Sequence, residues 1–426
     1  MVILKRGDLG SPVELLQLAL YRAGYGEGME RDGILGPETE QALRRFQKAN
    51  SLVADGTAGQ QTQRALLPYY TGFLRHRAGA GESIYSVAAR YGTLADRIMT
   101  ANPAIVPERL QAGAVITVPL AFPLVPTDIR YSSTLVAYVL RGLAARYPFI
   151  ELGQIGKSVM GKPLWKLGLG RGENRVLYNA SHHANEWICT PLLLKFAEEL
   201  AAAYASRGLV YGQSAEEIFN YATIHIVPAV NPDGIDLVTG ALRAGDYYRN
   251  ALRIAADYSS IPFPSGWKAN IQGIDLNLQY PANWEQARAN KYALGFVSPA
   301  PTDYVGVAPL SASESRTMYD YTLAFSPDLI LAYHTQGEVI YWRYEDYDVP
   351  GAAEIVRAFS EVSGYGAEDT PYSSGFAGYK DWFIQNYLRP GYTIEAGLGQ
   401  NPLPIEQFDE IYRDNLGILT LGTIVT

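Results

Sequence analysis

The chain has 426 residues, enough for roughly two to four domains at ~100–200 residues per domain. Hydrophobic residues make up 48% and charged residues 18%, a composition that supports a large core and excludes global disorder. The formal net charge of -8 argues against a nucleic-acid-binding protein, because such a protein would carry a basic surface.

Cysteine content and hydropathy add three expectations. Cys189 is the single cysteine, so no disulfide can form within the chain, and its apolar neighbours predict a buried packing residue. Residues 1–10 lack a basic region followed by an apolar stretch, so we expect no secretory signal there. Since no run of ~18 apolar residues occurs, we also expect no membrane span.

An internal repeat marks the N-terminal region. Residues 32–43 and 55–66 both read Asp-Gly-x-x-Gly-x-x-Thr-x-x-Ala-Leu, a tight glycine turn that leads into a helix. Apolar residues ahead of the repeat recur at a helical spacing that stops at Gly24. These patterns predict a small all-α bundle over residues 1–68, with Pro68 closing its last helix. The segment resembles the peptidoglycan-binding helical domain of cell-wall hydrolases, and a generic three-helix bundle is the alternative.

A second small module is expected over residues 73–120. Gly81–Ser83 reads as a turn before a helix, Asn102-Pro103 ends a second helix, and residues 110–119 read as a turn followed by an alternating strand. This βααβ order resembles a LysM domain, which implies binding to glycans that contain N-acetylglucosamine. The following linker, residues 121–130, contains two prolines and is expected to be a stiff, extended spacer.

Residues 131–426 alternate between strand and helix patterns. This alternation predicts an α/β domain with a mixed, mostly parallel sheet. The candidate strands are 175–180, 222–230, 328–333 and 391–395, and a helix of roughly 190–205 follows the first of them.

Four side chains at the ends of these strands predict a metal site. His183 and Glu186 follow the first strand as a His-x-x-Glu pair, and residues three apart share one face of a helical turn. His334 follows the third strand and Glu395 ends the fourth. The carboxyl ends of strands in an open α/β sheet line the ligand crevice. Two histidines and one glutamate form a zinc set with an open fourth position, so we expect His183, Glu186 and His334 to hold one zinc ion.

The two other histidines of this region have plainer interpretations. His225 alternates with isoleucines in a strand, which indicates a structural role. His182 either orients a neighbour or is solvated.

Residues 130–426 resemble the zinc carboxypeptidase A family. The resemblance depends on His-x-x-Glu-Trp at 183–187, Asn-Pro-Asp-Gly at 231–234, Gly-Ile-Asp-Leu-Asn at 273–277, His334-Thr335 and Glu395. It implies a zinc peptidase in which Glu395 is the catalytic glutamate. The non-catalytic alternative, a wall-binding protein with an inactive peptidase domain, is disfavoured because all three ligands and Glu395 are present.

The resemblance implies roles for some residues of this chain and shows where others depart from the family's pattern. Asp275 matches a carboxylate that orients the first zinc-binding histidine, and Asn277 matches a substrate-binding residue. Lys268 stands where the family has an oxyanion-stabilising arginine. Leu278 stands where carboxypeptidases have the arginine that binds the terminal carboxylate, which leucine cannot do. The family's mobile active-site tyrosine has no clean counterpart: residues 383–385 fall near its position, and Tyr387 is close but out of register.

The missing arginine and the two wall-binding modules together resemble the γ-D-glutamyl-L-diamino acid endopeptidase subgroup. This resemblance implies cleavage of peptidoglycan stem peptides between γ-D-glutamate and diaminopimelate or lysine. An ordinary metallocarboxypeptidase is the alternative. We expect peptidoglycan strands and stem peptides as partners, and a location at the cell wall or the spore. Since we expect no secretory signal in residues 1–10, we expect either a cytoplasmic protein, for example in a forespore, or one that is released by a non-classical route. The oligomeric state stays open.

Overall fold

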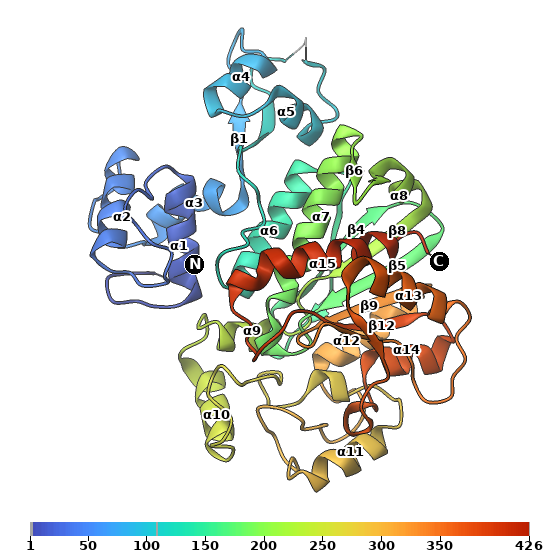
Figure 1. Cartoon of the computed structure of the whole chain (residues 1–426). Coiled ribbons are helices and arrows are strands. Elements are labelled where there is room, and N and C mark those ends of the chain that lie inside the picture. Colours follow the sequence, from blue (N-terminus) through green and yellow to red (C-terminus); the bar gives the residue numbers. More distant parts are fainter. Residues whose placement is uncertain (1–2, 108–109, 426) are drawn as a thin grey trace. The chain divides into compact units, whose positions relative to one another are not determined.

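The computed structural model describes residues 3–107 and 110–425, and the chain divides into two compact units, Met1–Glu151 and Leu152–Thr426 (Figure 1). The first unit begins with three helices and continues with a short two-stranded module. The helices are α1 (Ser11–Arg22), α2 (Pro37–Ala49) and α3 (Gln60–Thr71).

The two copies of the sequence repeat are held by the same buried contact. Gln17 is fully buried, and its side-chain nitrogen donates to Asp32 Oδ1 at 2.9 Å and to Thr39 Oγ1 at 3.0 Å. Its side-chain oxygen accepts from the backbone N–H of Gly33 at 2.9 Å. In each copy, the turn is therefore hydrogen-bonded to a buried glutamine of the preceding helix. Both polar atoms of the Gln17 side chain are paired, as a buried amide requires. Gln47 makes the same contacts with Asp55, Gly56 and Thr62.

The prediction that Pro68 closes the last helix is wrong. α3 continues through Pro68 to Thr71, and it ends at Gly72, whose N–H bonds to the Pro68 carbonyl at 2.7 Å. Gly72 has φ +73, and a Cβ there would lie 2.1 Å from a methyl carbon of Leu124. Only glycine fits this left-handed helix end, so the helix stops there rather than at the proline.

The second module has the expected βααβ order. Its strands β1 (Phe73–Arg77) and β2 (Val115–Pro119) pair antiparallel, and its helices are α4 (Ile84–Tyr91) and α5 (Ala95–Ala101). Asn102 ends α5 and fastens it to β2, because its side chain donates to the Thr117 carbonyl at 2.7 Å and accepts from the Thr117 N–H at 2.8 Å. An apolar core that includes Ile84, Ile98 and Val118 lies between helices and strands.

The segment after this module was expected to be a stiff, extended spacer, but part of it is packed against its own unit. Leu124 and Val125 are buried, and Arg146 of α6 (Ser133–Arg146) donates to the carbonyl of Phe122 at 2.7 Å. Two apolar side chains in sequence are enough to pack this stretch against its own unit, since their burial is favourable.

The second unit is built on an eight-stranded sheet with the order β11-β10-β12-β9-β5-β8-β4-β3. The four central strands, β12, β9, β5 and β8, run parallel, while β10 and β4 are antiparallel to their inner neighbours. β8 ends at Val227, earlier than predicted, because Pro228 has no N–H for the ladder. The strands are β3 (Glu151–Lys157), β4 (Pro163–Gly170), β5 (Asn174–Ala180), β8 (Ala222–Val227), β9 (Leu329–His334), β10 (Val339–Tyr341), β11 (Gly366–Glu368) and β12 (Gly391–Glu395).

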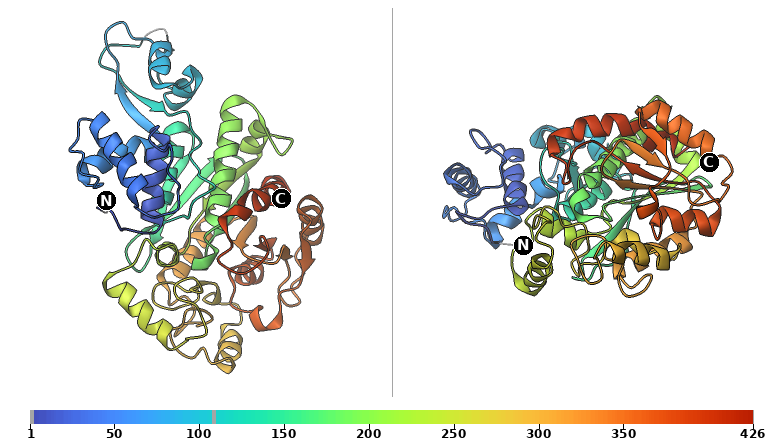
Figure 2. Two further views of the ribbon diagram at one scale, coloured as in Figure 1. Left: turned by 60° about the vertical axis from the view of Figure 1, so that its left-hand side comes forward. Right: turned by 60° about the horizontal axis from the view of Figure 1, so that its bottom comes forward.

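Helices cover both faces of this sheet (Figure 2). Successive residues of a strand point to opposite faces. Leu177 of β5 therefore joins an apolar core with Trp382 of α14, whereas the hydroxyl of Tyr178 donates to the Leu419 carbonyl of α15 at 2.9 Å. The sheet thus forms the middle of a three-layer α/β domain with two cores. The covering helices are α7 (Cys189–Ser206) and α15 (Phe408–Leu421) on one face, and α12 (Ser313–Phe325) and α14 (Tyr379–Tyr387) on the other.

The remaining elements lie around this sandwich. None of the helices within residues 3–107 and 110–425 has the length and apolar character needed to cross a membrane. The other elements are α8 (Ala215–Tyr221), α9 (Pro232–Val238), α10 (Gly245–Ala256), α11 (Trp284–Ala293), α13 (Ala352–Ser363), the strand pair β6 (Leu209–Val210) and β7 (Gln213–Ser214), and the 3-10 turns η2 (Ala184–Glu186), η3 (Leu276–Leu278), η4 (Tyr372–Ser374) and η5 (Ile405–Gln407).

Candidate metal centre

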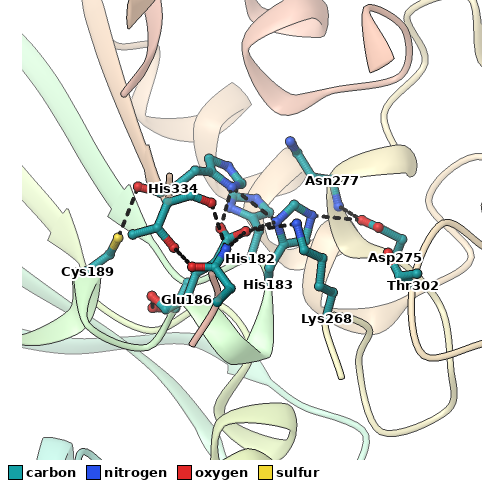
Figure 3. Close-up of polar contacts among 12 residues, drawn as sticks. His182, His183, Glu186, Cys189, Lys268, Asp275, Asn277, Thr302 and His334 are labelled. Atoms are coloured by element: carbon teal, nitrogen blue, oxygen red, sulfur yellow. Dashed lines mark hydrogen bonds and ion pairs between the residues drawn. The ribbon is translucent and has the colours of Figure 1, made fainter. Parts of the chain in front are cut away.

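Three side chains converge at the carboxyl edge of the central strands (Figure 3). His183 directly precedes the short turn η2 after β5, and Glu186 is the last residue of that turn. His334 is the last residue of β9, the parallel neighbour of β5. His183 Nδ1 lies 2.9 Å from Glu186 Oε1, and His334 Nδ1 lies 2.9 Å from the other carboxylate oxygen, Glu186 Oε2. The two Nδ1 atoms lie 3.3 Å apart, and one ligand atom of each residue lies within 4.8 Å of the others. This donor set can hold one metal ion, and imidazole with carboxylate is a combination that zinc accepts.

Asp275 determines which ring nitrogen of His183 faces this cluster. Its Oδ1 lies 3.1 Å from His183 Nε2. A carboxylate accepts hydrogen bonds, so Nε2 carries the proton and Nδ1 keeps the lone pair that a metal requires. Asp275 is itself held, because its oxygens accept from the backbone N–H groups of Asn277 at 3.1 Å and Asp303 at 3.2 Å.

Glu395 lies at the same edge, at the end of β12. It pairs with His334 in the register of β12 and β9, and both Glu395 and His183 line a cavity of about 410 Å³. Burial raises the pKa of the Glu395 carboxyl above its usual value. A carboxylate and the candidate ligands therefore face one shared space.

Lys268 brings a positive charge to this cavity. Its ammonium lies 3.2 Å from Glu186 Oε1, and its side chain is about one-third exposed. Burial alone would lower the pKa of Lys268, but the carboxylates of Glu186, Glu395 and Asp275 raise it above its usual value. The ammonium therefore keeps its charge at neutral pH.

Comparison with known proteins places this geometry in a family. Residues 136–417 match the zinc carboxypeptidase (peptidase M14) family model. The γ-D-glutamyl-L-diamino acid endopeptidase 1 of Lysinibacillus sphaericus is 42% identical over 303 residues, which cover 71% of this chain and 74% of that protein. The protein YqgT of Bacillus subtilis is 39% identical over 292 residues, 68% and 76% of the two chains. The chain belongs to the zinc carboxypeptidase family. It is therefore a peptidase.

Solved structures of this family share the fold. Bovine thrombin-activatable fibrinolysis inhibitor, in complex with tick carboxypeptidase inhibitor, superposes with a TM-score of 0.53 at 18% identity, over 70% of this chain and 97% of that chain. Carboxypeptidase A of Helicoverpa armigera gives 0.50 at 19% identity, over 70% and 74%. The predicted carboxypeptidase-like α/β fold with its mixed, mostly parallel sheet is confirmed.

The two predicted N-terminal modules are also confirmed. Residues 10–66 match the peptidoglycan binding domain family, and residues 76–119 match the LysM domain family. Both matches fall within the first structural unit.

The position that departs from carboxypeptidases faces the cavity. Asn277 and Leu278, both on η3, line it, and Leu278 is 7% exposed. The Asn277 side-chain oxygen accepts from the Tyr379 N–H at 3.0 Å, which leaves its amino group for a ligand. An apolar side chain thus lies beside an amide donor, at the position where the sequence comparison with carboxypeptidases predicts an arginine in those enzymes.

The residues near the position of the family's mobile tyrosine do not line the cavity, in keeping with the lack of a clean counterpart in the sequence. Phe383 is fully buried in α14, Gln385 donates to the Pro281 carbonyl at 3.1 Å, and the hydroxyl of Tyr387 donates to the Thr322 carbonyl at 3.3 Å. All three therefore serve packing.

His182, His225 and Cys189 are not part of the candidate ligand set, and each makes packing or hydrogen-bond contacts within the fold. His182 is buried, not solvated: its Nε2 lies 2.9 Å from the Tyr280 hydroxyl, and burial lowers its pKa well below the usual value. His225 of β8 stacks on Phe325 of α12, with their ring centroids 3.8 Å apart. Cys189 is buried as predicted, with its thiol 3.3 Å from the His334 carbonyl.

Asn401 is a contact of the centre that the sequence patterns did not reveal. Its side-chain nitrogen lies 3.4 Å from Glu186 Oε1 and 2.9 Å from the Thr335 carbonyl, and its oxygen accepts from the Thr335 hydroxyl at 2.6 Å. Asn401 therefore links the loop after β12 to a candidate ligand.

Proposed function

We propose that this peptidase is a zinc enzyme that hydrolyses peptidoglycan stem peptides at the bond between γ-D-glutamate and the diamino acid. The observation that carries the proposal is the 42% identity, over 303 residues, to a protein named for this activity. The two N-terminal modules support a peptidoglycan substrate, because the families that they match are the peptidoglycan binding domain and LysM.

His183, Glu186 and His334 are the proposed zinc ligands. Support comes from the convergence of two Nδ1 atoms on one carboxylate and from Asp275, which fixes the ring of His183. A bound zinc would supply Lewis acidity, which polarises the scissile carbonyl and makes water a better nucleophile.

The remaining site residues have proposed roles that follow from their chemistry. Glu395 accepts a proton from the attacking water and passes it to the leaving amine, because it is a carboxylate on the cavity wall. Lys268 stabilises the negative charge on the carbonyl oxygen, because its ammonium faces the same space. The free amino group of Asn277 donates to the substrate.

Leu278 supports internal cleavage over the removal of C-terminal residues. A carboxypeptidase needs a cationic donor for the terminal carboxylate, and a leucine at this point cannot provide one. The carboxypeptidase alternative would require the carboxylate to bind elsewhere in the cavity. We also infer that the protein associates with the cell wall, including that of the spore, because the two modules would hold it on peptidoglycan strands.

Mass spectrometry of wall digests tests the proposal. Purified enzyme with zinc is expected to release fragments that end in γ-D-glutamate and fragments that begin with a diamino acid. The Glu395→Gln protein is the matched control and should release neither. Release of single C-terminal residues alone would favour the carboxypeptidase, and no release by the zinc-loaded enzyme would favour a non-catalytic wall-binding protein.

A further inference from the structure

Glu186 is a buried carboxylate that depends on other side chains for its hydrogen bonds. It is 1% exposed, and its Oε1 atom lies 3.2 Å from the Lys268 ammonium and 3.4 Å from the side-chain nitrogen of Asn401. A carboxylate that has lost its contacts with water needs such donors, because burying a charge without partners is costly. Lys268 and Asn401 therefore support this candidate ligand in addition to the two histidines.

The two donors reach Glu186 in different surroundings. Lys268 lines the cavity and is about one-third exposed. In the proposed function its ammonium stabilises the carbonyl oxygen of the substrate, so its hydrogens are shared between Glu186 and a bound peptide. Asn401 is not one of the described residues that line the cavity. Its contact with Glu186 therefore does not compete with the substrate.

The amide of Asn401 has a single favourable orientation. Its nitrogen donates to the Thr335 carbonyl at 2.9 Å, and its oxygen accepts from the Thr335 hydroxyl at 2.6 Å. A carbonyl oxygen cannot donate, so the nitrogen of the amide has to face it. One of the two hydrogens on this nitrogen is used there, and the other is available to Glu186.

The loop that carries Asn401 is held at both ends. Pro402 restricts the backbone of Asn401, and the next residue, Leu403, is buried. Gln407 holds the start of the loop, because its side chain donates to the Leu398 carbonyl at 2.9 Å and accepts from the Leu398 N–H at 3.4 Å. The donor is thus already in place before a metal binds, as a supporting contact of a metal site requires.

We propose that Asn401 is a positioning residue of the metal centre, which holds the Glu186 carboxylate in the orientation that binds the metal. The inference rests on the proposed role of Glu186 as a zinc ligand. Asn401 would do for Glu186 what Asp275 does for His183, since groups that hydrogen-bond to metal ligands orient them and tune metal affinity.

Zinc affinity and the visible spectrum of the cobalt(II)-loaded full chain test the inference. Asn401→Ala removes the donor and should lower zinc affinity about 10-fold, the lower end of the ~10–100-fold range for such partners, because the amide is uncharged. Competition with a chromophoric chelator measures this change. The visible absorption of cobalt(II) depends on the arrangement of its ligands, so the spectrum should shift as well.

Gln407→Ala is the matched control. It loosens the same loop, but the contacts of Gln407 are with the backbone of Leu398 and not with Glu186. This variant should keep the zinc affinity and the cobalt spectrum of the wild type. Equal losses in Asn401→Ala and Gln407→Ala would assign the effect to the loop as a whole and overturn the inference. Wild-type affinity or a wild-type cobalt spectrum in Asn401→Ala would also overturn it.

A change at Thr335 provides the test if Asn401→Ala does not fold. Thr335→Val removes the hydroxyl that holds the Asn401 oxygen but keeps the amino group, so zinc affinity should fall by a smaller factor. Thr335→Ser retains the hydroxyl and should restore the wild-type value. In that case, equal affinities of Thr335→Val and the wild type would refute the inference. A wild-type protein that binds no zinc would instead refute the proposed ligand set, and the inference with it.

Discussion

His183 Nε2 lies 3.1 Å from Asp275 Oδ1, and this contact fixes the tautomer in which His183 Nδ1 faces Glu186. The same aspartate accepts from the backbone of Asn277 and Asp303, so it connects the candidate ligand His183 to two segments that line the cavity. Asp275 therefore contacts both the candidate metal centre and the wall of the cavity.

Asp275→Asn should weaken zinc binding. An amide accepts less strongly than a carboxylate and can also present its amino group, so the tautomer of His183 is no longer enforced. Partners of this kind typically contribute ~10–100-fold in metal affinity. Competition with a chromophoric chelator measures the change. Asp303→Asn is the control, because its backbone rather than its side chain contacts Asp275; equal affinities in the two variants would contradict the assignment.

His334→Ala should lose both zinc and activity, whereas His225→Ala should keep both. Both histidines lie in strands of the same sheet, but only His334 faces Glu186, and His225 stacks on Phe325. Metal analysis of the purified proteins, with turnover on a muropeptide, checks this contrast. A zinc-loaded, active His334→Ala protein would remove His334 from the ligand set.

Strand ends explain why much of the site was predictable. His183, His334 and Glu395 each follow an apolar run, and adjacent parallel strands bring such ends together whatever their separation in sequence. Asn401 lies on a loop with no periodic pattern, and its contact with Glu186 spans 215 positions.

The predicted helices and strands were wrong mainly where contacts elsewhere in the fold outweigh a local sequence preference. Proline was expected to end α3, but the helix continues through Pro68 because the left-handed Gly72 supplies the actual end. The burial of Leu124 and Val125 overrides the stiffness that two prolines suggest for the linker. The short strands β10 and β11, at one end of the sheet, have three residues each, too few for an alternating pattern to reveal them.

Deletion of residues 1–120 should leave turnover of small soluble muropeptides largely intact but weaken retention on insoluble peptidoglycan. Two tandem modules raise the effective concentration of substrate without taking part in the chemistry. Co-sedimentation with purified sacculi measures retention. Leu124 and Val125 are buried in the full chain, so the deletion could affect folding. The truncated protein must therefore first match the full chain in zinc content and in the melting temperature of the second unit. Unchanged retention would show that the modules do not hold the enzyme on the wall.

Glu395→Gln should keep zinc and substrate binding but lose most of the rate. Glutamine has nearly the shape of glutamate, and Glu395 is absent from the convergent ligand cluster, so the metal should stay in place. The amide cannot accept the proton of the attacking water or deliver it to the leaving amine. General acid–base steps contribute ~10²–10⁴-fold, so kcat should fall at least ~100-fold with little change in KM. Zinc analysis and steady-state kinetics on the same preparation separate the possibilities. Loss of zinc in step with activity would make Glu395 a ligand, and a near-normal kcat would assign proton transfer to another group.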